Sequence, residues 1–472
     1  MVSSVSAAVR WPPARPEARD AVGPEARDAV GYARANRGRD LVGLARWLAI
    51  PSISGHPRHA SDLVSAAAYL RAALAGAGVR TRVLPTGGAP VVVGDAGGPP
   101  GAPVVLIYGH YDVQPAGVGW TVPPFGPVRR GRDLLARGAN DDKGQVYAVV
   151  AAVRAWRDTG GAPSRVVLVV EGAEEIGSPG LRAALVAVRR RLRPDVVVVV
   201  DTERASDGAP TVTLSQRGRM AVEVLVDAGG DPVHPGRLGG AVVDPSMVMA
   251  DVLRELRGAV APLRAPPGAR DHAHPVTVRS DDDVRRAAGG RALVGGGLDR
   301  RISRLPAVSV TALAAGSRQG GNAVPARASA RVDVRLPPGV DVGPVSAALK
   351  RIACRRSTGG VRVLLRPRST DRGCRLAPAA GVLAALDRAA RLSFGTPLRY
   401  VRSGGSLPAA ALLETVFGIS PVLLGLGAPD GRAHGPDERM DLPGWSAGVE
   451  LLTHFLAQPV HCPIQSAREL ID

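Results

Sequence analysis

Three valine-rich apolar runs, separated by helix-like stretches, constrain the fold of this chain most strongly. They read PVVLIY at 103–108, SRVVLVV at 164–170 and PDVVVVV at 194–200. Short runs without polar alternation are typical of strands buried on both faces. Helical stretches at 145–157 and 181–192 lie between them. This alternation predicts an α/β fold, with a mostly parallel sheet covered by helices on both faces.

The pattern changes after residue 209. Residues 220–226 and 328–336 alternate polar and apolar side chains, which predicts strands with one exposed face, and helices are expected at 246–257 and 345–355. The first pattern returns with a helix at 378–392 and an apolar run at 421–426. We therefore expect a catalytic domain at 36–209 and 376–472, interrupted by an inserted α+β domain at 210–375. Residues 262–300, rich in Gly, Pro, Arg and Asp, predict a long loop.

An octapeptide, PEARDAVG, occurs at 16–23 and again at 24–31. One extra copy is far too short for a repeat array. We interpret it as an insertion tolerated near a terminus and assign residues 1–35 to an N-terminal extension. The first helices are then expected at about 40–48 and 60–75.

The charge of +18 raises the question of an anionic partner. Nucleic-acid binding needs clustered basic residues with aromatic side chains, but aromatic residues are only 3% of the chain and the arginines are scattered. No apolar run approaches the roughly 18 residues of a membrane span. We therefore expect neither nucleic acid nor membrane as a partner. The three widely spaced cysteines and the lack of an apolar leader predict a cytoplasmic protein.

Five polar clusters stand out, and four of them directly follow predicted strands, where ligands bind in open α/β sheets. They are GHYD at 109–112, ANDDKG at 139–144, EGAEE at 171–175, DTE at 201–203 and AHG at 433–435. Their imidazoles and carboxylates suit two divalent metal ions about 3.5–4 Å apart. Zinc is favoured, with manganese or cobalt as alternatives.

Two spacings within these clusters indicate specific chemistry. His110 and Asp112 are two residues apart, so in extended chain the carboxylate lies beside the imidazole and orients it. Glu174 and Glu175 are adjacent, which lets one bind metal while the other accepts a proton from an activated water.

The segments GHYDVQP, RGANDDKG, EGAEEIGS, VVVVVDTE and LGAPDGRAHGPDE resemble those of the dinuclear zinc peptidases and deacylases. That family includes carnosine dipeptidase, aminoacylase, glutamate carboxypeptidase and succinyl-diaminopimelate desuccinylase, and the wording is nearest the carnosine- and Cys-Gly-type dipeptidases. The resemblance extends from about Asp40 to Leu451. It implies a cis peptide bond between Asp141 and Asp142. It also implies these roles: His110 and Asp201 as ligands of one metal, Glu175 and His434 as ligands of the other, Asp141 as bridge, Glu174 as general base and Asp112 as orienter of His110.

The inserted domain resembles the lid and dimerisation domain of the same family. The segment DPVHPGRLGGAVVDP implies that His234 reaches the partner subunit's site and stabilises the oxyanion. Pro235 stands where the family usually has Ser, and Ser403 where it has Glu. The residues implied to hold the substrate's carboxylate are Asn322, Arg335, Gly405 and Ser406.

The expected function is metal-dependent hydrolysis of the amide bond of dipeptides or short peptides, by a metal-activated water with Glu174 as general base. The expected enzyme is a homodimer joined through its lid domain, with two divalent metal ions per chain. An N-acyl-amino-acid deacylase or carboxypeptidase on the same scaffold is the alternative. A basic RNA- or membrane-binding protein that has lost this chemistry is a different class, against which the intact ligand set argues.

Overall fold

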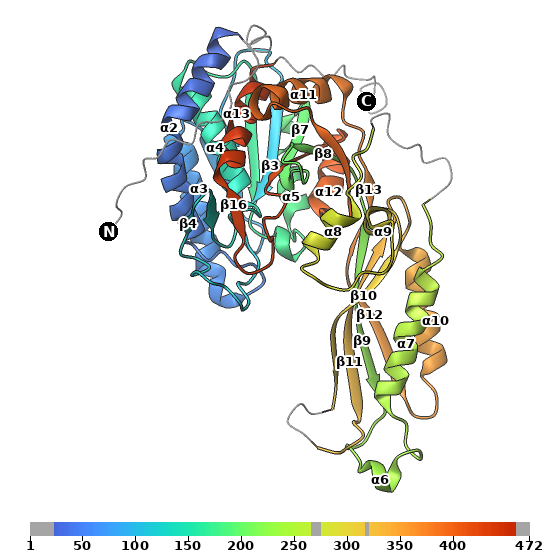
Figure 1. Ribbon diagram of the computed structural model, residues 1–472. Coiled ribbons are helices and arrows are strands. Elements are labelled where there is room, and N and C mark those ends of the chain that lie inside the picture. Colours follow the sequence, from blue (N-terminus) through green and yellow to red (C-terminus); the bar gives the residue numbers. More distant parts are fainter. Residues whose placement is uncertain (1–22, 266–274, 317–320, 459–472) are drawn as a thin grey trace. The chain divides into compact units, whose positions relative to one another are not determined.

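The computed structural model describes residues 23–265, 275–316 and 321–458. They form two compact units (Figure 1). Residues 214–376 and 401–411 belong to the second unit and the other described residues to the first. The chain first leaves the first unit within β8 (Thr211–Gln216) and finally returns to it within α12 (Pro408–Phe417). Across the described ranges, no helix is long and apolar enough to cross a lipid bilayer.

A sheet with a parallel centre forms the core of the first unit, in the strand order β1-β2-β6-β3-β7-β15-β8. Strands β6, β3, β7 and β15 pair in parallel, while β1, β2 and β8 pair antiparallel at the two sides. Val196 to Val200 of β7 are each at most 2% exposed, as expected for a strand covered on both faces. The predicted α/β fold is confirmed. The strands are β1 (Arg80–Leu84), β2 (Val91–Asp95), β3 (Val104–His110), β6 (Arg165–Glu171), β7 (Val196–Glu203) and β15 (Val422–Gly427).

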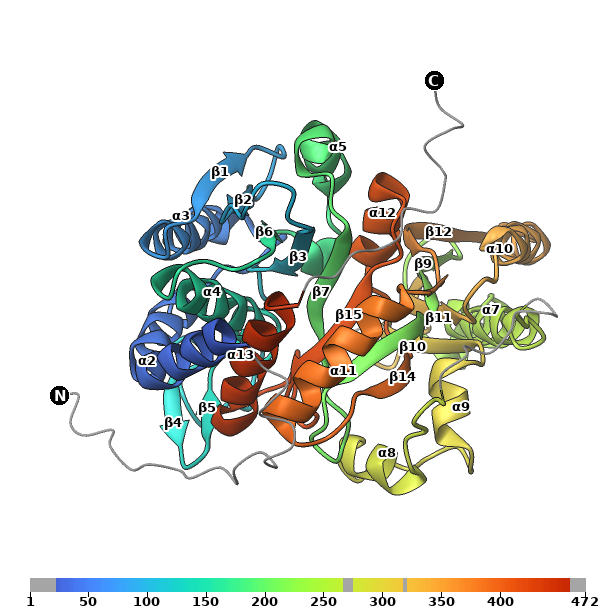
Figure 2. The ribbon, with the colours of Figure 1, turned by 90° about the horizontal axis from the view of Figure 1, so that it is seen from above.

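Helices cover both faces of this sheet. Figure 2 shows α2, α4, α11 and α13 on one face and α5 on the other. Helix α4 is buried along almost its whole length because α2 and α13 pack over it. The helices are α2 (Pro24–Leu48), α3 (Ala60–Gly76), α4 (Lys143–Asp158), α5 (Leu181–Leu192), α11 (Ala380–Phe394) and α13 (Leu442–Leu456). A separate small sheet contains β4 (Val128–Arg130), β5 (Asp133–Leu135) and β16 (Arg439–Asp441).

Helix α2 begins at Pro24, so the expected start near residue 40 is wrong. The second octapeptide copy forms the first turns of this helix, and its proline occupies a position where a missing N–H costs little. Ala26, Ala29, Val30 and Ala33 are buried, at the spacing of one helix face. The small side chains on this face let α2 pack closely against the rest of the first unit. The Arg and Asp residues around them in the sequence do not prevent this packing. The first copy falls almost entirely outside the described residues.

The second unit has an antiparallel sheet in the order β10-β11-β9-β12. Helices α7 and α10 pack side by side against one face of it (Figure 1). Alternate residues of β9 and β11 enter this core, as their polar–apolar alternation predicted. The elements are β9 (Gly218–Asp227), β10 (Ala307–Ala315), β11 (Arg327–Leu336), β12 (Arg362–Asp371), β13 (Cys374–Arg375), β14 (Arg399–Ser403, which starts in the first unit), α6 (Pro235–Leu238), α7 (Pro245–Val260) and α10 (Gly343–Arg356).

The long loop expected at 262–300 contains helical structure, so that expectation is wrong in part. Helix α8 (Asp281–Ala287) is followed by α9 (Leu298–Ser303). Ser280 starts α8 with a capping box, in which its side chain accepts from the backbone N–H of Asp283 and the Asp283 carboxylate accepts from the N–H of Ser280. Residues 266–274 lie outside the described residues.

Candidate metal centre

Polar side chains from five chain segments meet at one edge of the first unit's sheet. His110 is the last residue of β3, Asp201 lies in β7, and Glu174–Ile176 form a 3-10 turn after β6. The carboxyl ends of these parallel neighbours meet at the same edge. Asp141 lies just before α4, and His434 lies in the loop between β15 and β16.

Asp141 lies between two histidines. Its Oδ1 is 3.0 Å from Nε2 of His110, and its Oδ2 is 3.1 Å from Nε2 of His434. Nε2 of His434 is also 3.2 Å from Oε2 of Glu175, and Nε2 of His110 is 3.7 Å from Oδ1 of Asp201. The structure therefore brings together all five expected ligands, with Asp141 in the shared position. The peptide bond between Asp141 and Asp142 is cis.

Asp142 also lies in this cluster, although no role was expected for it. One of its carboxylate oxygens, a nitrogen of His110 and an oxygen of Asp201 lie within 4.8 Å of one another. Its Oδ2 accepts from the backbone N–H of His110 at 3.1 Å, while Oδ1 is buried and has no hydrogen-bond partner in the described ranges. Gly109 permits this approach, because a Cβ there would lie 2.6 Å from Oδ2. The sequence signal for Asp142 is its place beside Asp141 in RGANDDKG.

Asp112 connects His110 to the turn that carries the two glutamates. Nδ1 of His110 lies 3.0 Å from the backbone carbonyl oxygen of Asp112 and 3.4 Å from its Oδ1, so Nε2 faces the cluster. The two carboxylate oxygens of Asp112 accept from the backbone N–H groups of Glu174 and Glu175, each at 3.1 Å. Gln114 donates from Nε2 to Oε2 of Glu175 at 2.8 Å, and its sequence signal is its place in GHYDVQP.

Carboxylates outnumber imidazoles in this cluster, and this excess of negative charge raises the pKa values of the two histidines. Hydrogen bonds to Asp141 and Glu175 raise the pKa of His434 to about 10. Burial lowers the pKa of His110, but the charge of Asp201 and hydrogen bonds to its carboxylate neighbours outweigh this and raise it.

The carboxylates respond to the same crowding. Burial raises the pKa of Asp201 to about 6 and that of Glu174 well above its usual value. Burial also acts to raise the pKa of Asp141, but hydrogen bonds from His110 and His434 outweigh it and lower it. His434 is the exposed member of this cluster, whereas His110 and Asp142 are buried. A cluster with this excess of carboxylates, one oxygen of which is unpartnered in the described residues, fits divalent cations, which displace protons from such ligands.

His234 and Asn322 lie near each other in the second unit. His234 is exposed and caps the short helix α6, with its Nδ1 accepting from the N–H of Gly236 at 3.1 Å. Val233 and Val324 form an antiparallel bridge through two backbone hydrogen bonds of 3.1 and 2.8 Å. This bridge brings the His234 segment beside the Asn322 segment.

Arg335, Gly405 and Ser406 form a separate group in the second unit. Arg335 donates from Nη1 to Oγ of Ser406 at 3.3 Å and from Nε to Oδ1 of Asp333 at 2.6 Å. Ser406 in turn donates to the backbone carbonyl of Arg217 at 2.6 Å. Arg217, which is 8% exposed, also donates to the carbonyl of Gly404.

The two groups lie at opposite ends of one strand. Asn322 precedes the start of β11 at Arg327, while Arg335 is near its end. Eight residue steps of a strand span about 26 Å. His234 and Arg335 of one chain are therefore too far apart to contact the same dipeptide.

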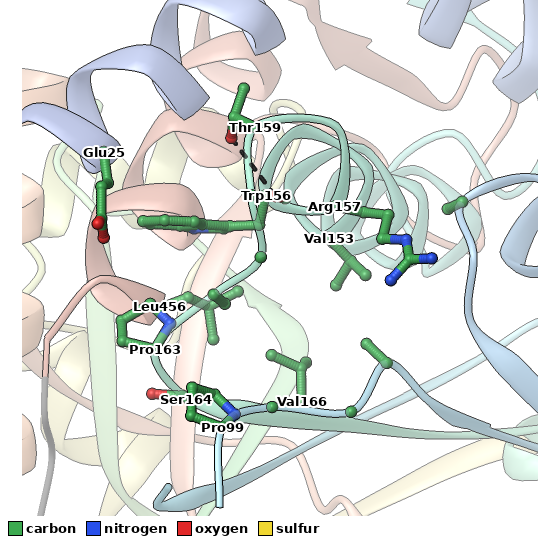
Figure 3. A pocket seen from close by; sticks show the side chains of 17 residues that line it. Glu25, Pro99, Val153, Trp156, Arg157, Thr159, Pro163, Ser164, Val166 and Leu456 are labelled. Carbon is green, nitrogen blue, oxygen red and sulfur yellow. Dashed lines mark hydrogen bonds between the residues drawn. The ribbon is translucent and has the colours of Figure 1, made fainter.

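A pocket of about 480 Å³ lies at the other end of β6, away from the cluster (Figure 3). Trp156, Ser164 and Val166 are among its lining residues, and none of the predicted site residues lines it. The residues of β6 between Val166 and the turn at Glu174 separate it from the site.

The chain is similar in sequence to metal-dependent dipeptidases over most of its length. A profile of Peptidase family M20/M25/M40 matches residues 106–458. The chain is 26% identical over 400 residues to the Cys-Gly metallodipeptidase of Schizosaccharomyces pombe, covering 78% of this chain and 82% of the relative. It is 26% identical over 452 residues to human β-Ala-His dipeptidase, covering 88% and 89%. It is 27% identical over 425 residues to the cysteinylglycine-S-conjugate dipeptidase of Corynebacterium striatum, covering 86% and 92%.

Solved structures share the fold. The dipeptidase Dug1p of Saccharomyces cerevisiae matches with a TM-score of 0.82 at 22% identity, covering 92% of this chain and 98% of that one. Human carnosine dipeptidase 1 matches with a TM-score of 0.78 at 23% identity, covering 92% and 99%. At these identities the likeness establishes the fold.

Proposed function

Because the chain belongs to Peptidase family M20/M25/M40, we propose that it is a metal-dependent dipeptidase that hydrolyses the amide bond of dipeptides or short peptides with a free C-terminus. The observation that carries this proposal is the carboxylate of Asp141, which has one oxygen beside His110 and the other beside His434. The relatives named as Cys-Gly and β-Ala-His dipeptidases support the substrate class.

The donor set supports two divalent ions, with zinc as the first candidate. His110 and Asp201 would hold one ion, Glu175 and His434 the other, and Asp141 both. Bound divalent ions polarise a carbonyl and lower the pKa of water. A carboxylate oxygen of Asp142 is a further candidate donor beside His110 and Asp201, and its Oδ1 has no hydrogen-bond partner among the described residues.

Glu174 is the proposed general base. It lies on the same turn as Glu175, and Asp112 holds the backbone N–H groups of both residues. The two glutamates therefore have separate proposed roles. Glu175 lies beside His434 and would hold a cation, whereas Glu174 accepts the proton of the attacking water and returns it to the leaving amine.

Arg335 is proposed to bind the substrate's C-terminal carboxylate together with Gly405 and Ser406 of the same chain and with Asn322 of the partner subunit. A planar guanidinium suits a carboxylate. Its contact with Ser406 supports a shared site on the 403–406 loop, where Gly405 donates its N–H to Oγ of Ser403 at 3.0 Å.

A homodimer joined through the second unit is the proposed assembly, with His234 acting on the partner's substrate. The separation of about 26 Å along β11 supports this arrangement, because His234 and Arg335 of one chain do not reach one small substrate. In a dimer, His234 and Asn322 of one chain meet the substrate held by the other. A cytoplasmic location stays a prediction from the cysteine pattern.

A hydrolysis screen tests the function. Purified protein loaded with Zn²⁺, Mn²⁺ or Co²⁺ is given Cys-Gly, β-Ala-His, other dipeptides, a C-terminally amidated dipeptide and N-acetyl-amino acids. Release of free amino acids from dipeptides, but not from the amidated control, is expected. Turnover of N-acetyl-amino acids alone would make the chain a deacylase instead. No turnover of any amide by metal-loaded protein would overturn the proposal.

A further inference from the structure

We propose that Glu438 is a positioning residue of the metal centre, which holds the loop that carries Asp141 and locks it to the loop that carries His434. This inference rests on the proposed function. Glu438 is fully buried and has no place among the residues expected from the sequence. Its sequence signal is its position four residues after His434, in HGPDE.

The side chain of Glu438 accepts hydrogen bonds from one continuous stretch of backbone. Oε1 accepts from the N–H groups of Asn140 at 2.9 Å and Asp141 at 3.0 Å. Oε2 accepts from the N–H of Gly138 at 3.1 Å. The backbone carbonyl of Glu438 adds a fourth bond, from the N–H of Ala136 at 3.0 Å. Glu438 therefore fixes the path of the chain from 136 to 141.

A buried arginine balances the charge of this carboxylate. Arg137 is 1% exposed and donates from Nη1 to Oε2 of Glu438 at 2.7 Å. Arg137 is held by the carbonyls of Pro115 and Ala116 and lies over the ring of Trp120. Both carboxylate oxygens are thus needed as acceptors. A glutamine at this position would replace one of the two acceptor oxygens with an NH₂ group. The N–H bonds of that group would then face the N–H donors that the oxygen had accepted from.

A second clamp joins the same two loops. Asn140 accepts at Oδ1 from the N–H of Ala428 at 2.6 Å, and its Nδ2 lies 3.4 Å from the Ala428 carbonyl. Ala428 directly follows β15, at the start of the segment that leads to His434. The loop carrying His434 is therefore attached to the Asp141 loop at both of its ends, by Asn140 and by Glu438.

This attachment has a specific consequence for metal binding. Asp141 is the residue shared by both histidines, so a shift of its backbone changes both candidate sites at once. Loss of a residue that orients a ligand typically weakens metal affinity or activity about 10–100-fold. Substitution of Glu438 should therefore weaken the binding of both metal ions, although Glu438 is not itself one of the proposed ligands.

The test is a metal titration of four full-length proteins: wild type, Glu438→Gln, Glu438→Asp and Asp40→Asn. Asp40 is a matched control because it is another buried carboxylate paired with a buried arginine, Arg154, which lies roughly 16 Å along α4 from Lys143. Zn²⁺ affinity is measured by calorimetry with a competing chelator. The Co²⁺ absorption spectrum reports ligand geometry, and circular dichroism confirms folding.

We expect Glu438→Gln to bind both ions about 10–100-fold more weakly, with an altered Co²⁺ spectrum. Glu438→Asp, which keeps two acceptor oxygens on a shorter side chain, should show a smaller loss in the same direction and is informative even where the glutamine variant does not fold. Asp40→Asn should lose stability but bind metal like the wild type. Wild-type affinity in folded Glu438→Gln or Glu438→Asp would overturn the inference. A wild-type protein that binds no metal would overturn the proposed function and this inference with it.

Discussion

The carboxylate of Asp112 accepts a hydrogen bond from the backbone N–H of Glu174, with 3.1 Å between Oδ1 and N. The same residue's carbonyl lies beside Nδ1 of His110. One aspartate therefore sets the direction of an imidazole at the end of β3 and the position of the glutamate turn after β6. This places the proposed base in a fixed relation to the ligands, and it makes the roles of the two adjacent glutamates separable by experiment.

Glu174→Gln should lower kcat by about 10²–10⁴-fold while leaving metal content and KM nearly unchanged, because a general base contributes to rate rather than affinity. Glu175→Gln is the matched variant, one residue along the same turn, and should instead weaken metal binding because it removes the carboxylate that faces His434. Steady-state kinetics and metal analysis at saturating Zn²⁺ separate the two. Near-normal kcat in Glu174→Gln would show that another group takes the proton.

The wild-type protein should bind two divalent ions per chain and lose activity when a chelator removes them. Protons should be released on binding at neutral pH, because carboxylate neighbours raise the pKa of His434 to about 10 in the metal-free protein and the metal competes with that proton. Metal affinity should therefore rise between pH 6 and pH 8. Calorimetry in buffers of different ionisation enthalpy measures the released protons. A stoichiometry of zero or one would contradict the dinuclear site.

His234→Ala should lower kcat by about 10²–10³-fold, the usual effect of removing an oxyanion donor. Mixing this variant with Glu174→Gln tests whether His234 acts on the partner. After subunit exchange, a heterodimer has one site with its own Glu174 and the partner's intact His234, so activity should return. A mixture in which heterodimers form but activity does not return would rule out action between subunits. Each variant alone is the control.

The stability of the fold should depend on pH through His454, which is 8% exposed in α13. Burial, with a smaller effect of Arg34, lowers its pKa to about 4. The unfolded chain takes up this proton near its ordinary pKa of about 6.5, so it binds more protons than the folded chain between these values. The free energy of unfolding should therefore fall as pH decreases from about 6.5 to 4, by roughly 3 kcal/mol in total from this group.

Urea unfolding of the wild type and of His454→Gln, at several pH values between 4 and 7, measures this contribution. The difference between the two proteins should change with pH in that window and be constant above it. Parallel profiles would show that His454 is protonated equally in both states.

The sequence by itself determined the fold class and the chemistry of the site. An apolar run such as Val196–Val200 indicates by itself a strand that is buried on both faces. In an α/β sheet, the polar residues that follow such strands lie at one edge. His110, Asp141 and Glu175 could therefore be named from their position and residue type. Family resemblance added their division into two sets of ligands.

The sequence named Asp112 as the residue that orients His110, but only the tertiary structure decided which groups hold the Asp141 and His434 loops in place. Glu438 contacts the N–H of Asp141 across 297 residues of sequence, and no periodicity reports a partner at that distance. Ala29 looks in the sequence like any exposed helix residue, but it is fully buried in α2, a helix that packs beside α4 and α13. The patterns that predict strands and helices depend on residues that are neighbours in the chain. The partners of a buried carboxylate, or of a helix face made of small residues, depend instead on contacts between segments far apart in the sequence. Those contacts form only when the chain folds.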